Sequence, residues 1–296
     1  MIDATVLLQP LFPAPIREAT SLDPGYVSHA SDVWLVRTDT EEVVVRACRA
    51  TGPLRGPFST GCRRLFGTDP RCVWELEGTN ATLADLSPVR VPRVLRRGKL
   101  GDRQCVLVER MPGNPLQTFI GAPLRIPRDL GLAVAHIHQR TYPWCGSLTG
   151  RVRVELPAFG AHLAATMRTL CGEYRPELRA TVEEVCQAVP GLPTPAVGTL
   201  VLPDLDATQF LAQDGRLTAL VDTEYACVGP RELDFVALEY VLDAPAAAAF
   251  REAYASVLPL PVVGPVRRVY RLLYLLLEVQ GRRPLGQWLP QPALFA

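Results

Sequence analysis

The chain has 296 residues, of which 48% are apolar and 21% are charged, a composition that supports a folded core and excludes a disordered chain. Its 31 basic and 30 acidic residues leave a net charge of +1, which argues against a dedicated nucleic-acid binder. The most apolar helical stretch, residues 272–279, is far shorter than the roughly 20 residues that cross a bilayer, and no signal-peptide pattern opens the chain. We therefore expect a cytoplasmic protein with no nucleic-acid or membrane partner, and eight reduced thiols rather than disulfides.

The first third of the chain is predicted to form strands. Residues 33–36 and 43–45 are short apolar runs on either side of a polar turn, which is typical of an antiparallel hairpin. Residues 92–95 and 105–108 form a second such pair around a turn at 98–102. Two antiparallel hairpins therefore indicate a small sheet in this part of the molecule.

The segments around these hairpins differ in character. Residues 73–86 have a helical pattern with acidic residues at the start, where the helix dipole favours them. Residues 48–70 are rich in Gly, Pro and Arg, which predicts a long loop. After residue 110 the apolar period becomes helical, in four segments: 129–139, 161–170, 178–189 and 269–279. The pattern predicts an α+β fold with a sheet lobe over residues 1–109 and a helical lobe over residues 110–296.

A non-helical segment, residues 198–228, interrupts the helices and carries the strongest chemical signal. Two apolar strand-like runs in it each end in an aspartate, Asp204 and Asp222. Between the aspartates, Asp214 and Gly215 form a typical hairpin turn, which would bring the two strand ends to the same side. The sequence therefore predicts that the two carboxylates share one cleft.

Two carboxylates placed in this way suit phosphoryl transfer. One accepts a proton from a substrate hydroxyl, and the other holds Mg²⁺ against nucleotide phosphates. Mg²⁺ usually takes one or two carboxylates together with phosphate and water oxygens, so the amide oxygen of Gln209 is a candidate ligand. Glu224 has two open roles, as a further metal ligand or as the partner of an arginine. Each acid alone is more typical of a solvated turn, and only the ordered set points to this chemistry.

The run LVLPDLDATQFLAQDGRLTALVDTEYACVGPRELDFVALEY resembles the catalytic segment of the aminoglycoside phosphotransferase and choline kinase-like family, which is related to the protein kinases. The resemblance implies a kinase-like two-lobed fold with a small antiparallel-sheet N-lobe and a larger helical C-lobe. It implies transfer of the γ-phosphoryl group of ATP, or GTP, to a hydroxyl of a small molecule such as an aminoglycoside, amino alcohol or sugar. Asp204 would be the catalytic aspartate, Gln209 and Asp222 would be Mg²⁺ ligands, and Asp234 would have a structural role.

The resemblance extends from about residue 22 to about residue 280. Three residues before the first predicted strand match the family's nucleotide-covering loop: Gly25, Ser28 and His29. Arg46 falls where the family carries a phosphate-binding Lys or Arg. Its partner on the following helix is either Glu75 or Glu77, and spacing slightly favours Glu77.

Two further segments match the family. VLVERMPGNPL is similar to its hinge, which implies that Glu109, Arg110 and Met111 line the adenine slot. LGLAVAHIHQ is similar to a helix that ends in a histidine, here His138, which we expect to make a packing or hydrogen-bond contact near the catalytic loop.

The chain departs from the family pattern inside the catalytic segment. Leu202 and Pro203 stand where the family has His and Gly, and Gln209 stands where it has Asn. A second hypothesis therefore remains open, in which the chain is a catalytically degenerate kinase-like protein that binds a nucleotide or another ligand. The acceptor pocket is predicted in the helical lobe, near residues 159–179 and 244–254, and these regions do not identify the acceptor.

Overall fold

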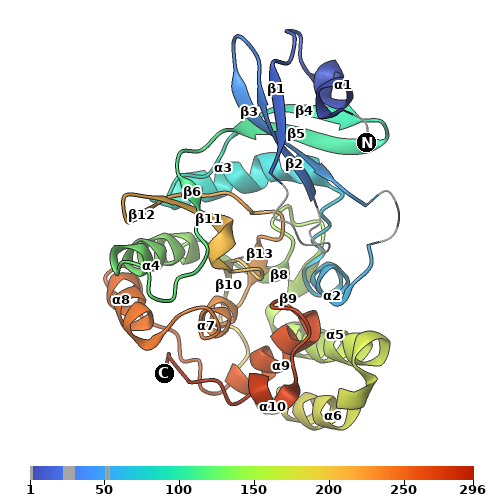
Figure 1. Cartoon of the computed structure of the whole chain (residues 1–296). Helices are drawn as coiled ribbons and strands as arrows, with labels where there is room; N and C mark the ends of the chain where they lie inside the picture. Colours follow the sequence, from blue (N-terminus) through green and yellow to red (C-terminus); the bar gives the residue numbers. More distant parts are fainter. Residues whose placement is uncertain (1–2, 23–30, 51, 53) are drawn as a thin grey trace.

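The computed structural model describes residues 3–22, 31–50, 52 and 54–296. Helix α1 and a five-stranded antiparallel sheet lie at one end of the molecule, and the larger helices gather at the other (Figure 1). The sheet has the order β1-β2-β3-β5-β4. The bounds in this part are α1 (Ala4–Leu8), β1 (Glu18–Ser21), β2 (Ser31–Arg37), β3 (Glu42–Cys48), β4 (Val94–Leu100) and β5 (Arg103–Glu109).

Both predicted hairpins are confirmed. β2 pairs with β3 from Ser31 opposite Cys48 to Arg37 opposite Glu42, and β4 pairs with β5 around a turn at Gly101. The observed strands are longer than predicted because pairing continues into polar residues. β1 is a strand that apolar pattern does not reveal, since it is a mostly exposed edge strand that pairs with β2.

The predicted loop over residues 48–70 is wrong, because this segment contains helix α2 (Pro57–Phe66). Its proline begins the helix and Gly67 ends it with a φ of 73°, so these residues mark helix ends rather than a loop. Cys62 and Leu65 are fully buried in the core cluster of the large lobe, and α2 packs against helices of that lobe. The predicted helix over residues 73–86 is confirmed as the 3₁₀ turn η2 (Val73–Glu75) followed by α3 (Leu76–Leu86).

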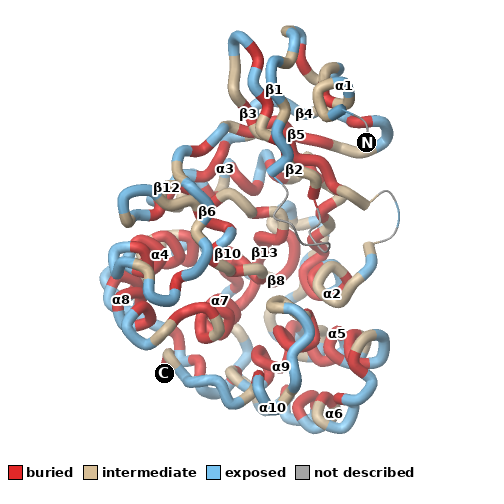
Figure 2. The backbone as a smooth tube through the Cα atoms, in the orientation of Figure 1, coloured by how far each residue is buried: buried red, intermediate tan, exposed pale blue. Residues whose placement is uncertain are grey.

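The large lobe is built around one continuous apolar core, in which the buried faces of its helices meet (Figure 2). Its four predicted helices are confirmed as α4, α5, α6 and α9. Helix α8 packs closely on α4 at Gly131, where a Cβ atom would lie 2.5 Å from the carbonyl oxygen of Phe250. No helix of the described residues is long and apolar enough to cross a membrane. The bounds are α4 (Arg125–His138), α5 (Phe159–Tyr174), α6 (Arg179–Ala188), α7 (Glu232–Leu238), α8 (Ala244–Ala255), α9 (Arg267–Leu277) and α10 (Leu285–Trp288).

Two small sheets lie between the five-stranded sheet and these helices (Figure 1). One has the order β7-β10-β13-β8-β9 and the other the order β12-β11-β6. The predicted hairpin is confirmed as β11–β12, with Asp214 and Gly215 in the turn at φ values of 53° and 72°. The bounds are β6 (Asn114–Pro115), β7 (Thr141–Tyr142), β8 (Trp144–Gly146), β9 (Arg153–Glu155), β10 (Gly198–Val201), β11 (Phe210–Gln213), β12 (Arg216–Leu220) and β13 (Cys227–Gly229).

Candidate active site

Arg46 connects the five-stranded sheet to the segment that follows β12. Its guanidinium leaves β3 and donates from Nη2 to Asp222 Oδ1 and to Glu224 Oε1, both at 2.8 Å. It also donates from Nη1 to the carbonyl of Val221 at 2.8 Å and from Nε to Glu224 Oε1 at 3.1 Å. Burial lowers the pKa of Arg46, but the charges of Glu224 and Asp222 outweigh it and raise the pKa above its usual value, so the guanidinium stays charged.

Glu224 and Asp222 differ in how freely they reach solvent. The Glu224 side chain is only 4% exposed and also accepts from Ser31 Oγ at 2.6 Å, whereas the Asp222 side chain is 45% exposed. Burial raises the pKa of Glu224, and the Arg46 charge opposes that rise. The arginine pairing, one of the two roles that the sequence left open, is therefore the one found. Glu224 is thus found as a partner of Arg46 and Ser31, and its role as a metal ligand stays a prediction.

The predicted pairing of Arg46 with Glu77 is wrong. Glu77 lies on the exposed face of α3, where its carboxylate accepts from Arg97 Nε at 2.6 Å. Glu75 pairs with Arg151 at 3.2 Å. The buried face of α3 instead presents Leu76 and Leu83 together with the polar Thr79 and Asn80.

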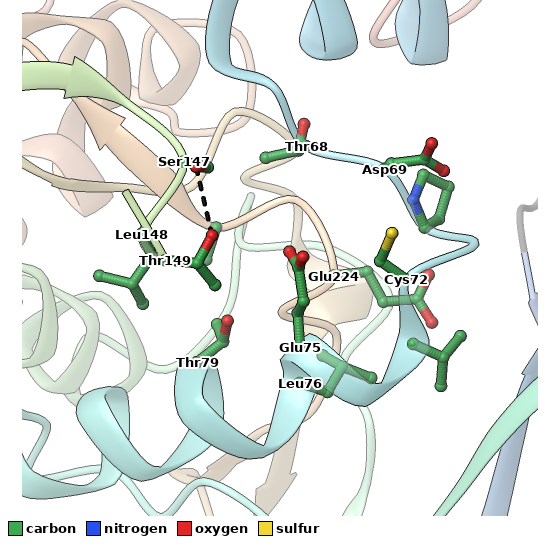
Figure 3. A pocket seen from close by; sticks show the side chains of 13 residues that line it. Thr68, Asp69, Cys72, Glu75, Leu76, Thr79, Ser147, Leu148, Thr149 and Glu224 are labelled. Carbon is green, nitrogen blue, oxygen red and sulfur yellow. Dashed lines mark hydrogen bonds between the residues drawn. The ribbon is translucent and has the colours of Figure 1, made fainter. Parts of the chain in front are cut away.

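Glu75 and Glu224 both line a pocket of about 30 Å³ beside η2 and α3 (Figure 3). The space suffices for about one or two water molecules. Burial raises the pKa of Glu75, and the Arg151 charge opposes it. Among the described residues, the other polar side chains in the lining are Thr68, Asp69, Cys72, Thr79, Ser147 and Thr149.

Asp204 follows β10 and has no hydrogen-bond partner for its side chain within the described part of the chain. Burial raises the pKa of Asp204 well above its usual value, and the charges of Asp222, Asp206 and Glu224 raise it further. Asp204 and Asp222 are therefore within electrostatic range of each other. An ion shared between the two carboxylates stays a prediction.

Tyr225, which the sequence analysis did not single out, lies close enough to Asp204 to feel its charge. Burial raises the pKa of Tyr225, and the negative charges of Glu224 and Asp204 add to this rise. The Tyr225 hydroxyl is 2.9 Å from Ser59 Oγ, and its ring packs edge-on against Phe58 at 4.6 Å between centroids. The first turn of α2 thus packs against Tyr225 in the segment that follows β12. The prediction of a loop over residues 48–70 does not include this contact.

Asp204 also lines a pocket of about 10 Å³. No residue from 159–179 or 244–254, the regions predicted to line the acceptor pocket, borders it. Its lining residues are Pro203, Asp204, Leu205, Asp206, Ala237, Tyr240, Val279 and Gln280.

Gln209 ends the 3₁₀ turn η6 (Ala207–Gln209) and is 5% exposed. Its Oε1 atom is buried and has no hydrogen-bond partner among the described residues. A buried amide oxygen without a protein partner suits a cation, and Mg²⁺ prefers oxygen ligands. No group of three or more His, Cys, Asp or Glu is placed to hold a metal in the described ranges. A Mg²⁺ ion would therefore rely on Asp222, on Gln209, and on phosphate and water oxygens, and this donor set fits it.

A buried hydrogen-bond chain fixes the backbone of the catalytic loop. The amide of Leu202 donates to Asp234 Oδ1 at 2.9 Å, and the other carboxylate oxygen lies 3.1 Å from His138 Nε2. Nδ1 of His138 lies 3.0 Å from the Tyr254 hydroxyl. The predicted contact of His138 near the loop and the structural role of Asp234 are confirmed. The loop is held by its backbone, so an apolar side chain at Leu202 leaves this anchor intact.

The predicted nucleotide contacts are placed only in part. Glu109 accepts from the backbone amide of Arg93 at 3.1 Å and from Nε of the same residue at 2.8 Å. Met111, an apolar side chain of the predicted hinge, is 6% exposed. Arg110 donates to Glu42 at 2.8 Å. Contacts of these residues with adenine stay predictions. The predicted loop residues Gly25, Ser28 and His29 lie outside the described residues.

Comparison with protein families matches residues 27–260 to the family described as the phosphotransferase enzyme family. No curated protein sequence matches the chain. Among solved structures, macrolide 2'-phosphotransferase MphH from Brachybacterium faecium is 18% identical, with a TM-score of 0.63 over 93% of this chain and 89% of that one.

Two other similar structures are aminoglycoside phosphotransferases. ADP-bound APH(2'')-Ib is 14% identical, with a TM-score of 0.61 over 99% of this chain and 98% of that one. The ternary complex of APH(2'')-IIa with streptomycin and ATP is 14% identical, with a TM-score of 0.58 over 95% of this chain and 90% of that one. At these identities the likeness shows the fold, which is the kinase-like two-lobed α+β fold that the sequence predicted.

Proposed function

Because the chain belongs to the phosphotransferase enzyme family, we propose that it is a small-molecule kinase that transfers the γ-phosphoryl group of ATP, or GTP, to a hydroxyl. The observation that carries the proposal is the unpartnered buried oxygen of Gln209, a residue whose backbone carbonyl accepts from the amide of Val221, next to Asp222. Phosphoryl transfer needs a carboxylate beside the acceptor hydroxyl, and it needs a carboxylate and an amide oxygen that bind the metal beside the phosphates.

Each residue has a defined role in this proposal. Asp204 orients the acceptor hydroxyl and accepts its proton, for which its raised pKa is favourable. Asp222 and Gln209 would hold Mg²⁺, which when bound neutralises phosphate charge. Arg46 turns part of its guanidinium from Asp222 to the phosphates, because its fork can serve a carboxylate and a phosphate together.

We propose that residues 1–109 bind the nucleotide and residues 110–296 bind the acceptor. Helix α2 crosses this boundary, because it lies in the first part of the chain and is buried against the second. The small pocket lined by Asp204 and Asp206 supports an acceptor hydroxyl approaching from that side. An aminoglycoside, an amino alcohol or a sugar is the proposed acceptor class.

A second candidate is a binding protein that does not transfer phosphate. The specific observation in its favour is the ion pair between Arg46 and Asp222. This pair must weaken before both oxygens of the Asp222 carboxylate can coordinate a metal. The departures at Leu202 and Gln209 support the same candidate.

The test is turnover of Mg-ATP and Mg-GTP with a panel of aminoglycosides, amino alcohols, sugars and macrolides, combined with a thermal-shift titration. Phosphate transfer that is lost in Asp204→Asn supports the kinase. Mg²⁺-dependent stabilisation by nucleotide without transfer to any acceptor supports the binding protein, since a ligand that binds only the folded state must stabilise it.

A further inference from the structure

A buried hydrogen bond joins α3 to the segment that carries Asp222. The hydroxyl of Thr223 donates to Oδ1 of Asn80 at 2.5 Å, and Nδ2 of Asn80 donates to the carbonyl of Pro92 at 2.8 Å. Asn80 is 3% exposed and Thr223 is 1% exposed. Because both partners are almost completely removed from solvent, the bond restrains them more strongly than a surface contact would.

Asn80 thereby connects three parts of the molecule. It belongs to α3, its amide binds the backbone just before β4, and its carbonyl oxygen binds the segment after β12. Both amide functions are used, which fixes the orientation of the side chain. Within the described residues, this is the side-chain hydrogen bond that ties α3 to the segment of Asp222, since Glu75 and Glu77 are paired elsewhere.

The two faces of the segment have different partners. Arg46 binds both Asp222 and Glu224, which places these side chains on one face, and Thr223 between them turns to Asn80 on the other. A shift of Thr223 therefore has to move the backbone that carries Asp222. Because Asp222 is half-exposed and is held on one side only by Arg46, its position depends on this anchor.

We propose that Asn80 is a positioning residue that acts through Thr223 to set the place of the Asp222 carboxylate for a magnesium nucleotide. The inference rests on the proposed function, in which Asp222 is a metal ligand. In this proposal, α3 is connected to the segment of Asp222 by the buried hydrogen bond between Asn80 and Thr223. An ion pair between α3 and Arg46 is not needed for that connection.

The first measurement is calorimetric binding of a non-hydrolysable ATP analogue, with Mg²⁺ and with chelator, to the wild type and to four variants. Asn80→Ala and Thr223→Val remove the hydrogen bond, Thr223→Ser keeps the hydroxyl, and Thr166→Val is the matched control. Thr166 is 1% exposed and donates to the carbonyl of His162 within α5, so its variant removes a buried threonine hydrogen bond elsewhere in the fold.

Mg²⁺ should raise the affinity for the ATP analogue in the wild type, and we expect Asn80→Ala and Thr223→Val to lower that increase about 10-fold. The affinity measured with chelator should not change. The reason is that residues that orient a metal ligand typically contribute 10–100-fold to metal affinity. Thr223→Ser and Thr166→Val should keep the wild-type gain. A wild-type gain in both Asn80→Ala and Thr223→Val would overturn the proposal. Thr223→Val is nearly isosteric and decides the matter if Asn80→Ala does not fold.

The second measurement separates this inference from the proposed function. Hydrogen exchange in the nucleotide-free protein should quicken several-fold at residues 221–224 in Asn80→Ala and Thr223→Val, but not in Thr166→Val, because losing the anchor lowers the cost of local opening. If the wild type binds no magnesium nucleotide, the proposed function fails and exchange alone decides. In that case, unchanged exchange contradicts the anchor and faster exchange supports it.

Discussion

The two acidic segments of the site differ in how completely their polar groups are paired. The segment of Asp222 and Glu224 is held by Arg46, Ser31 and Asn80, through bonds of 2.5 to 3.1 Å. In the catalytic segment, the buried Oε1 atom of Gln209 has no hydrogen-bond partner among the described residues. Buried polar groups without protein partners are rare and point to a ligand. The comparison therefore teaches that the protein pairs the acidic side chains of one segment, whereas in the other it fixes the backbone and leaves the Gln209 oxygen open to a ligand.

The largest effect should come from the catalytic segment. Asp204→Asn removes the proposed proton acceptor and should lower kcat about 10²–10⁴-fold, the usual contribution of a general base. Asp222→Ala should lower turnover by loss of metal binding, and excess Mg²⁺ should restore part of it. Steady-state kinetics at several Mg²⁺ concentrations measure both variants. Turnover that survives intact in both would show that the assigned roles are wrong.

The organised segment should control stability instead. Glu224→Gln leaves the buried Arg46 with a weaker partner and should destabilise the fold by about 1–3 kcal/mol. Glu77→Gln is the matched control, because its pair with Arg97 is half-exposed on both sides, and it should change stability by less than about 0.5 kcal/mol. Urea denaturation measures both. Equal effects would contradict the partner assignment of Arg46.

A smaller effect concerns pH. Because the folded state raises the pKa of Asp204 above 3.8, the unfolded chain releases this proton at lower pH, and the ionised carboxyl costs stability at neutral pH. Asp204→Asn should therefore stabilise the nucleotide-free protein by about 1 kcal/mol at pH 7. The gain should shrink as pH falls and vanish below 3.8, where both states bind the proton. Denaturation from pH 4 to pH 8 measures it, and a gain that grows on acidification would contradict the sign.

The smallest effect should be at Gln209. Gln209→Asn shortens the side chain by one methylene and should change the Mg²⁺ concentration for half-maximal turnover by less than about 10-fold, because the amide oxygen is retained. Gln209→Leu removes that oxygen and should raise this concentration further than Gln209→Asn does. Identical Mg²⁺ dependence in the two variants would remove Gln209 from the proposed ligand set.

The sequence predicted the parts of the fold whose signals are local. The β2–β3 and β4–β5 hairpins, the turn at Gly215, and α3, α4, α5, α6 and α9 follow from period and turn chemistry. Helix α2 does not follow from the sequence pattern, because Gly67 and the helix-starting proline resemble loop signals although they mark helix ends. β1 was missed because an exposed edge strand carries little apolar pattern.

The positions of the site residues along the chain could be predicted from the sequence, but the contacts between their side chains could not. The sequence picked out Asp204, Asp222 and Arg46, because these residues lie at strand ends or in a strand. It left open that Glu224 pairs with an arginine but did not identify that arginine as Arg46, since the contact joins residues far apart in the chain. Asn80 did leave a signal, as a polar residue on the apolar face of α3 between Leu76 and Leu83.

A crystal structure of the protein soaked with Mg²⁺ and a non-hydrolysable ATP analogue tests the central claim most directly. We predict one ion bound at roughly 2.0–2.1 Å to an Asp222 oxygen and to Gln209 Oε1, beside the phosphates, with the Asp204 carboxylate facing the γ-phosphate. An ion elsewhere, or Asp204 turned away from the phosphates, would contradict the claim that the two aspartates serve one phosphoryl-transfer site.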